Sequence, residues 1–263
     1  LLRDPFDNVN PDFRPGAGSP ATSGVVSVTA PPADGFFEAV DYIGAMDPDE
    51  NWIAGWTTTE QPAASGEAVS PTTLSGEITS DMTLTSDTQY LLSGAVFVRS
   101  GATLTIEAGT TIFGENTTQG TLVIDKGAKI MAEGTAAAPI VFTSDQVARD
   151  RAQWGGLIIN GNAPINTGDV AFGEGDTGEY GGTDPDDNSG TLRYVRVEFA
   201  GIEFSPDNEL NGIAFQGVGS GTTVDYVQVH FNQDDGVEFF GGTVDAKHLI
   251  CTGIRDDSFD WTD

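Results

Sequence analysis

Six acidic residues near the end of the sequence are the best candidates for chemistry. Two Asp pairs recur at an interval of 22 in sequence number (256 − 234), and a Glu and an Asp behind them repeat that interval: Asp234-Asp235, Asp256-Asp257, Glu238 and Asp260. If this interval is one turn of a repeating structure, all six carboxylates share one small patch. They repel one another unless a cation binds, their pKa values rise or solvent screens them. Clustered carboxylates are ligands that Ca²⁺ prefers, so we predict a calcium site at these six residues.

Two other interpretations of the acidic patch stay open. Asp at a corner of the chain forms Asx turns and accepts backbone N–H groups, which requires no metal. Alternatively, two carboxylates at a defined separation hydrolyse glycosidic bonds. A polysaccharide lyase would instead need Ca²⁺ and a basic residue, for which Arg255 is the nearby candidate. Because no Lys, His or aromatic platform accompanies the carboxylates, the sequence identifies no catalytic residue.

The elements that must position these carboxylates repeat with a period just above twenty. Two apolar series share the same two intervals, 24 (237 − 213) and then 22 (259 − 237): Ile213, Val237 and Phe259, and Phe215, Phe239 and Trp261. Short apolar triplets between Gly, Asp and Asn turns are typical of a β-solenoid, whose coils must stack to bury their apolar faces. We therefore predict an all-β fold, a right-handed parallel β-helix over residues 74–263, with both series in interior ladders.

Other intervals extend this prediction. Leu104 and Leu122 differ by 18 in sequence number (122 − 104), which predicts that they stack in neighbouring coils. A second inward ladder is predicted from three apolar pairs: Val195/Val197, Val227/Val229 and Leu249/Cys251. Cys251 is the only cysteine, so no intrachain disulfide forms, and its inward position predicts a buried, inert thiol. His230 and His248 have no Ser, Cys or metal-ligand partner at a useful spacing and are predicted to be surface or edge residues.

Composition restricts the possible partners. The chain carries 40 Asp and Glu against 11 Lys and Arg, a formal charge of −29. A surface this acidic repels nucleic acid and anionic lipid, so neither is an expected partner. No segment approaches the length of a transmembrane helix. Residues 1–73 are predicted to be an irregular Pro- and Gly-rich segment with an aromatic cap block and a linker.

Several phrases resemble secreted or cell-surface right-handed parallel β-helix proteins of Gram-negative bacteria. They are residues 91–98, 104–112, 154–164, 205–212, 217–229 and 256–263. The resemblance covers about residues 74–263 and implies an exported, lipoprotein-like protein at the outer cell surface, but no assigned activity. In such proteins, segments like 10–20, 36–45 and 51–56 usually follow the β-helix, whereas here they precede it. We therefore expect a longer chain of tandem modules, with the β-helix continuing beyond residue 263.

These observations favour a non-enzymatic extracellular structural protein with bound calcium, acting as a subunit of a filament or array. An open coil presents unpaired strand edges, and head-to-tail contacts that do not close produce filaments. We expect self-association of this kind, and contact with cell-surface polysaccharide. The alternative is a polysaccharide hydrolase or lyase on a pectate-lyase-like β-helix.

Overall fold

The chain divides into two compact units, Leu1–Glu60 and Gln61–Asp263. The computed structural model describes residues 2–7, 10–22, 29–33, 35–60, 71–205 and 208–262. In the first unit, β1 (Leu2–Asp4) and β2 (Asp12–Pro15) pair antiparallel, and most other described residues form turns and bends. The Arg14 guanidinium donates two hydrogen bonds to Asp12 and holds the pKa of that carboxyl at about 2.

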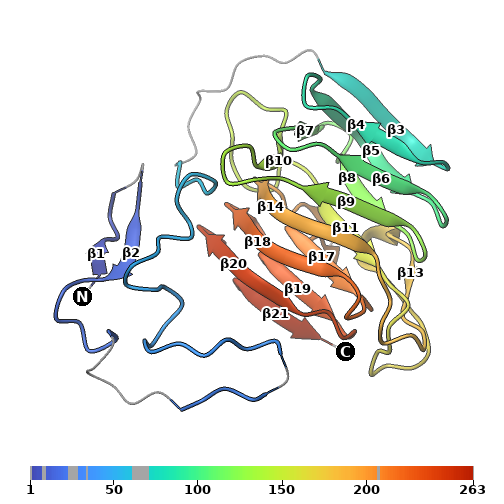
Figure 1. Cartoon of the computed structure of the whole chain (residues 1–263). Helices are drawn as coiled ribbons and strands as arrows, with labels where there is room; N and C mark the ends of the chain where they lie inside the picture. The colour runs from blue at the N-terminus through green and yellow to red at the C-terminus, as the bar shows by residue number, and fades with distance from the viewer. Residues whose placement is uncertain are drawn as a thin grey trace. The chain divides into compact units, whose positions relative to one another are not determined.

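The second unit is the predicted right-handed parallel β-helix (Figure 1). Among the described residues, fifteen strands form one continuous sheet that winds around three faces. Face 1 contains the second halves of β3 (Thr72–Ile78) and β5 (Tyr90–Val98), then β8 (Thr121–Ile124), β11 (Gly156–Asn160), β17 (Ile213–Gln216), β19 (Val237–Phe240) and β21 (Phe259–Thr262). Face 2 contains β4 (Met82–Leu84), β6 (Thr103–Ile106), β9 (Lys129–Glu133) and the first halves of β14 (Gly190–Glu198), β18 (Thr223–His230) and β20 (Ala246–Thr252). Face 3 contains the first halves of β3 and β5, then β7 (Thr111–Gly114), β10 (Ile140–Ser144) and the second halves of β14, β18 and β20.

The interior ladders of the later coils match the predicted register. Both apolar series on face 1 are aligned residue by residue across β17, β19 and β21. The rings of Phe215 and Phe239 stack at 5.4 Å, and those of Phe239 and Trp261 at 5.8 Å. Trp261 nevertheless remains 69% exposed, because among the described residues no further side chain stacks on its outer side. The second predicted ladder is also confirmed, with Val229 beside Cys251.

The predicted stacking of Leu104 on Leu122 is wrong. Leu104 lies on face 2 and is aligned with Ile130, whereas Leu122 lies on face 1 between Val96 and Leu157. From Leu104 to Leu122 the chain passes from face 2 through face 3 to face 1. The interval of 18 is therefore shorter than one complete coil. Similar apolar triplets on different faces therefore produced a false period.

The outer surface of face 1 changes character along the helix. Val123, Ile158 and Ala214 form an outward row that continues, in register, into Glu238 and Asp260. The apolar part of this row is buried in a second hydrophobic cluster with side chains from the connections 161–189 and 199–212, namely Tyr180, Ile202 and Leu210, and with Phe240 of β19. These connections contain β12 (Ala171–Phe172), the 3₁₀ turn η1 (Glu174–Asp176), β13 (Glu179–Tyr180), β15 (Glu203–Ser205) and β16 (Asn208–Glu209).

Candidate metal centre

Five carboxylates gather where the turns before β19 and β21 meet the outer surface of face 1. They form two overlapping triads, and in each triad one oxygen from every side chain lies within 4.8 Å of the others. The triads are Asp234, Asp235 and Asp256, and Asp235, Glu238 and Asp260. We call these five residues the carboxylate cluster. Asp235 belongs to both triads and is therefore its centre.

The repeat explains why these side chains meet. Parallel pairing aligns Glu238 with Asp260, so two outward carboxylates lie one strand spacing, about 4.8 Å, apart. The preceding turn is held by the Asn232 side chain, which donates a 2.7 Å hydrogen bond to the Asp235 carbonyl. The Asp257 backbone N–H donates a 2.9 Å hydrogen bond to Asp235 Oδ1. Asp257 thus contributes its main chain and lies outside both triads, and its carboxylate as a ligand stays a prediction.

Burial makes the cluster electrostatically unfavourable without a cation. Asp235 and Glu238 are each only 9% exposed. Burial, with neighbouring carboxylates adding to it, raises the pKa of Glu238 to about 8 and that of Asp234 to about 7. Burial also raises the pKa of Asp235. The Asn211 side chain opposes this effect by donating a 2.6 Å hydrogen bond to Glu238 Oε2. A bound cation would offset the remaining cost of keeping these groups ionised.

The structure adds residues to the cluster that were absent from the predicted set. Asn211 is 2% exposed, and its Oδ1 atom has no hydrogen-bond partner among the described residues. Its position in the repeat is that of Asp235, so the aligned sequence carried a signal for it. Glu174 and Glu209 lie close enough to raise the pKa of Asp234. Both come from the connections over face 1, outside the repeat, so no interval in the sequence places them beside Asp234.

A polar cavity of about 390 Å³ adjoins the cluster. Four carboxylates, one amide and one guanidinium line it: Glu203, Glu209, Asp234, Asp256, Gln233 and Arg255. An acidic wall therefore faces solvent beside a single lining cation. The cavity would admit hydrated ions or part of a polar chain.

The donor set suits a hard cation. Both triads consist only of carboxylate oxygens, and the amide oxygen of Asn211, whose nitrogen donates to Glu238, has no partner among the described residues. Ca²⁺ takes six to eight oxygen ligands of this type, whereas structural zinc sites use Cys and His. The five carboxylates with Asn211 could therefore hold Ca²⁺, which would supply the positive charge that the cluster lacks.

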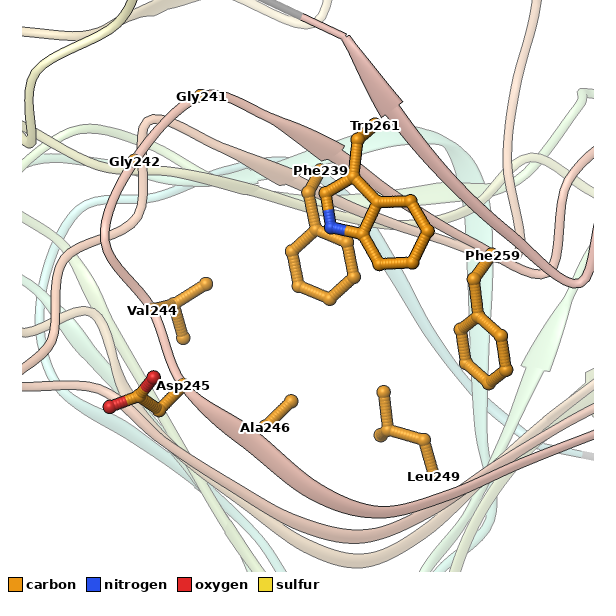
Figure 2. A pocket seen from close by; sticks show the side chains of 9 residues that line it. All are labelled: Phe239, Gly241, Gly242, Val244, Asp245, Ala246, Leu249, Phe259 and Trp261. Carbon is orange, nitrogen blue, oxygen red and sulfur yellow. The ribbon is translucent and has the colours of Figure 1, made fainter. Parts of the chain in front are cut away.

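A second, apolar cavity of about 460 Å³ lies at the end of the described helix (Figure 2). Figure 2 shows Phe239, Trp261, Phe259 and Leu249 pointing into the space that the coil encloses. These residues belong to the interior ladders, so the cavity is an extension of the core. Its lining residues are apolar or Gly except for one acidic residue, Asp245.

The cysteine and the two histidines singled out from the sequence all make contacts within the fold. Cys251 donates to the Ser258 carbonyl at 3.1 Å, and burial raises the pKa of its thiol to about 12. His230 is buried at 1% exposure beside Thr252, which corrects its predicted surface position. His248 lies 2.7 Å from Asp225 and stacks on Tyr226 at a left-handed corner.

The fold and site define a class: a three-faced parallel β-helix with an acidic, oxygen-rich outer patch. The chain belongs to the family of pectate-lyase-like β-helix domains, whose model matches residues 76–263. No curated protein and no solved structure matches the chain significantly. The family match confirms the β-helix part of the resemblance, whereas secretion, a Gram-negative source and a lipoprotein-like character stay predictions. Within the described residues, no helix has the length and apolar character needed to cross a membrane.

Proposed function

We propose that this chain is a non-enzymatic extracellular β-helix that binds Ca²⁺ at the carboxylate cluster and serves a structural role. The observation that carries the proposal is the pair of triads sharing Asp235, with Asp235 and Glu238 more than nine-tenths buried. Buried carboxylates in such numbers need a counter-charge, and neither triad contains a cationic side chain. The net charge of −29 adds to this need.

An extracellular location agrees with the kind of site proposed. Extracellular calcium modules bind with dissociation constants of about 10⁻⁴–10⁻³ M, which solvent-accessible carboxylates can provide. Asp256 is exposed and Asp260 is partly exposed, so the ion would stay in contact with solvent on one side. Calcium would then tie the turns before β19 and β21, which carry Asp234, Asp235 and Asp256, to the strands themselves, which carry Glu238 and Asp260.

Isothermal titration calorimetry tests calcium binding. Chelator-treated protein is titrated with CaCl₂, and in parallel with MgCl₂. We expect saturable binding of Ca²⁺ with weaker binding of Mg²⁺, because Mg²⁺ demands near-ideal octahedral geometry and gives up its water reluctantly. The matched control is Glu133→Gln, which removes an exposed carboxylate from face 2. Absence of saturation at 10 mM CaCl₂, on the order of ten times the weakest expected dissociation constant, would contradict the proposal.

Head-to-tail self-association is part of the structural proposal. Among the described residues, β4 pairs only with β6, and β3 only with β5. Such edges can accept strands from a second copy, which favours filaments. Electron microscopy of purified protein with and without CaCl₂ tests this. Ordered fibres support the structural role, and discrete monomers under both conditions count against it.

A polysaccharide-active enzyme is the second candidate function. The family match and the cavity that places Arg255 beside Asp234 and Asp256 favour it. Asp234, with its pKa raised to about 7, is suited to donate a proton to a glycosidic oxygen. Incubation with acidic and neutral polysaccharides, followed by reducing-end and unsaturated-product assays, distinguishes the two. Cleavage that is lost in Asp234→Asn would establish the enzyme and refute the structural role.

A further inference from the structure

A polar row runs along the outer edge of face 1. It begins at Arg99 and continues, one residue per coil, through Asp125, Asn160 and Gln216. Asn160 and Gln216 are aligned across β11 and β17 and point outward, because the residue before each belongs to the interior core. At the other end of the row, Arg99 Nη1 lies 2.8 Å from Asp125 Oδ2. The row therefore leads from an ion pair to two uncharged amides.

A short segment of the connection between β11 and β14 lies over these amides. Residues 171–180, which comprise β12, η1 and β13, form what we call the cover. One end of the cover is fixed by Tyr180, which packs edge-on against Phe240 at 6.0 Å. Beneath the cover, Asn160 is 0% exposed and Gln216 is 2% exposed. Both amides are therefore removed from solvent, although they lie on the outer surface of the sheet.

Two buried oxygens under the cover lack a positive partner. Asn160 Nδ2 donates a 2.8 Å hydrogen bond to the Thr177 carbonyl, and Thr177 Oγ1 donates at 2.7 Å to the Glu174 carbonyl. These two donors are therefore already used. The amide oxygens of Asn160 and Gln216, in contrast, have no partner among the described residues. Because a buried acceptor without a partner is costly, the pair indicates a bound group that supplies positive charge.

A glycine of the cover lies directly on these oxygens. A Cβ atom at Gly173 would collide with both Gln216 Oε1 and Thr177 Oγ1, so the two oxygens flank the same point. Any larger residue at this position would fill the space between them. The Thr177 side chain is itself 2% exposed, and its hydroxyl oxygen keeps lone pairs free for a further contact.

A second glycine of the cover lies beside Asn160 and Asp125. A Cβ atom at Gly178, where φ is +106°, would lie 3.2 Å from Asn160 Nδ2 and 3.6 Å from Asp125 Oδ1. Because Arg99 binds the other carboxylate oxygen, Oδ2, it is Oδ1 that lies on the side of the cover. Four side chains thus contribute oxygens beneath the cover: Asp125, Asn160, Thr177 and Gln216.

These oxygens suit a cation of low charge. Asp125 supplies the only carboxylate among them, and Arg99 already offsets its charge. The affinity of a Ca²⁺ site depends on the number of charged ligands, so a single shared carboxylate disfavours a divalent ion. Carbonyl oxygens, however, replace the hydration shell of an alkali-metal ion in dehydrated protein sites. The amide and hydroxyl oxygens here are ligands of that kind.

We propose that the amide oxygens of Asn160 and Gln216 bind a dehydrated alkali-metal cation beneath the cover, with Thr177 Oγ1 and Asp125 Oδ1 as further ligands. The ion satisfies the two buried oxygens and ties the cover to β11 and β17. The site shares no residue with the carboxylate cluster and needs no calcium, so it goes beyond the function proposed above.

Thermal melts of the full chain test the alkali-metal site. They are recorded in EDTA with equal concentrations of LiCl, NaCl, KCl, RbCl or choline chloride. Choline screens the net charge of −29 equally well but is too large for the buried site. At least one alkali chloride should raise Tm above the value in choline chloride by about 2–4 °C, because the ion binds only the folded chain. Equal Tm values in all five salts would overturn the proposal.

Two substitutions of one ligand separate binding from a purely structural role. Gln216→Met removes the amide oxygen, keeps the length of the side chain and should abolish the cation-dependent rise in Tm. Gln216→Glu adds a negative charge at the same place and should enlarge that rise. The matched control is Gln228→Met, which removes a fully buried outward amide from face 3 and should retain the rise. An unchanged rise in Gln216→Met would refute the assigned ligands.

Crystals grown in the most stabilising alkali chloride and in choline chloride identify the occupant. We expect an ion bonded to both amide oxygens in the alkali salt and no such ion in choline chloride. A water molecule at this place in both salts would satisfy the two oxygens without a cation and would overturn the proposal. Because these experiments contain EDTA, their failure leaves the calcium site at the carboxylate cluster untouched.

Discussion

Replacing Glu238 by Gln should change the stability of the chain in opposite directions with and without calcium. The carboxyl is 9% exposed, and its pKa is raised from 4.5 to about 8. Keeping it ionised in the folded protein therefore costs up to about 5 kcal/mol, which solvent at the cluster reduces to roughly 2–3 kcal/mol. Gln has nearly the same shape and carries no charge. In chelator at pH 9, Glu238→Gln should be more stable by this amount, about 5–10 °C in Tm.

The pH dependence follows from the sign of the shift. Because the folded pKa of this acid is raised, the folded protein binds more protons than the unfolded chain between pH 4.5 and about 8. Stability of the metal-free protein should therefore fall as pH rises through this window, and less so in the variant. At pH 5 the two proteins should be nearly equal.

Calcium should reverse the order. At a concentration of 1,000 times Kd, the unmodified chain gains about 4.1 kcal/mol, which exceeds the advantage of Glu238→Gln in chelator. The variant gains less because one ligand is missing. Thermal melts at pH 5, 7 and 9, in EDTA and in CaCl₂, measure both effects, with Glu133→Gln as the control. If Glu238→Gln were destabilised in EDTA at pH 9, the carboxylate would not be under electrostatic strain, and the reasoning would be refuted.

Three further predictions concern the fold and the thiol. Phe215→Ala should lower the unfolding free energy by about 3–5 kcal/mol, since Phe215 is fully buried in the interior ladder; a loss below about 1 kcal/mol in urea titration would contradict it. Gly190→Ala should cost about 3 kcal/mol or more, because φ is +117° and a Cβ would lie 1.9 Å from the Ile130 carbonyl oxygen. Gly101→Ala, with φ +89° and open space around it, should cost only about 1–2 kcal/mol, so equal losses in these two variants would refute the steric explanation. Cys251, with its thiol pKa at about 12, should react with Ellman's reagent at pH 8 only after unfolding; rapid reaction of the native protein would show an accessible thiolate.

The later coils were predictable because their loops are short and nearly equal. Ile213, Val237 and Phe259 follow at almost constant intervals, so aligning the sequence with itself also aligned the strands. The earlier coils were not predictable in this way. Only the strand triplets must stack, and corners accept insertions of any length: Ile140 pairs with Val195, although β11, β12 and β13 all lie between them in the chain.

The part of the candidate site that lies on the repeat was predictable for the same reason. The five carboxylates of the cluster follow the interval between the last two coils, which the sequence displays directly. Glu174 and Glu209 raise the pKa of Asp234 from connections that obey no period, and their positions depend on how those connections fold over face 1. Asp257 shows that the interval alone can also predict too much. Its interval placed it among the six predicted ligands, whereas in the structure its backbone N–H makes the contact with Asp235.

Anomalous diffraction from crystals grown in CaCl₂ tests the calcium site most directly. We predict an anomalous peak within the carboxylate cluster, with Asp235 among its ligands and oxygen distances of about 2.3–2.6 Å. The same crystals of Asp235→Asn, which removes the carboxylate shared by both triads, should lose the peak. A cluster without anomalous density at millimolar calcium, with Asp235 bound only to the Asp257 backbone N–H, would contradict the calcium site and leave these residues as turn-forming groups.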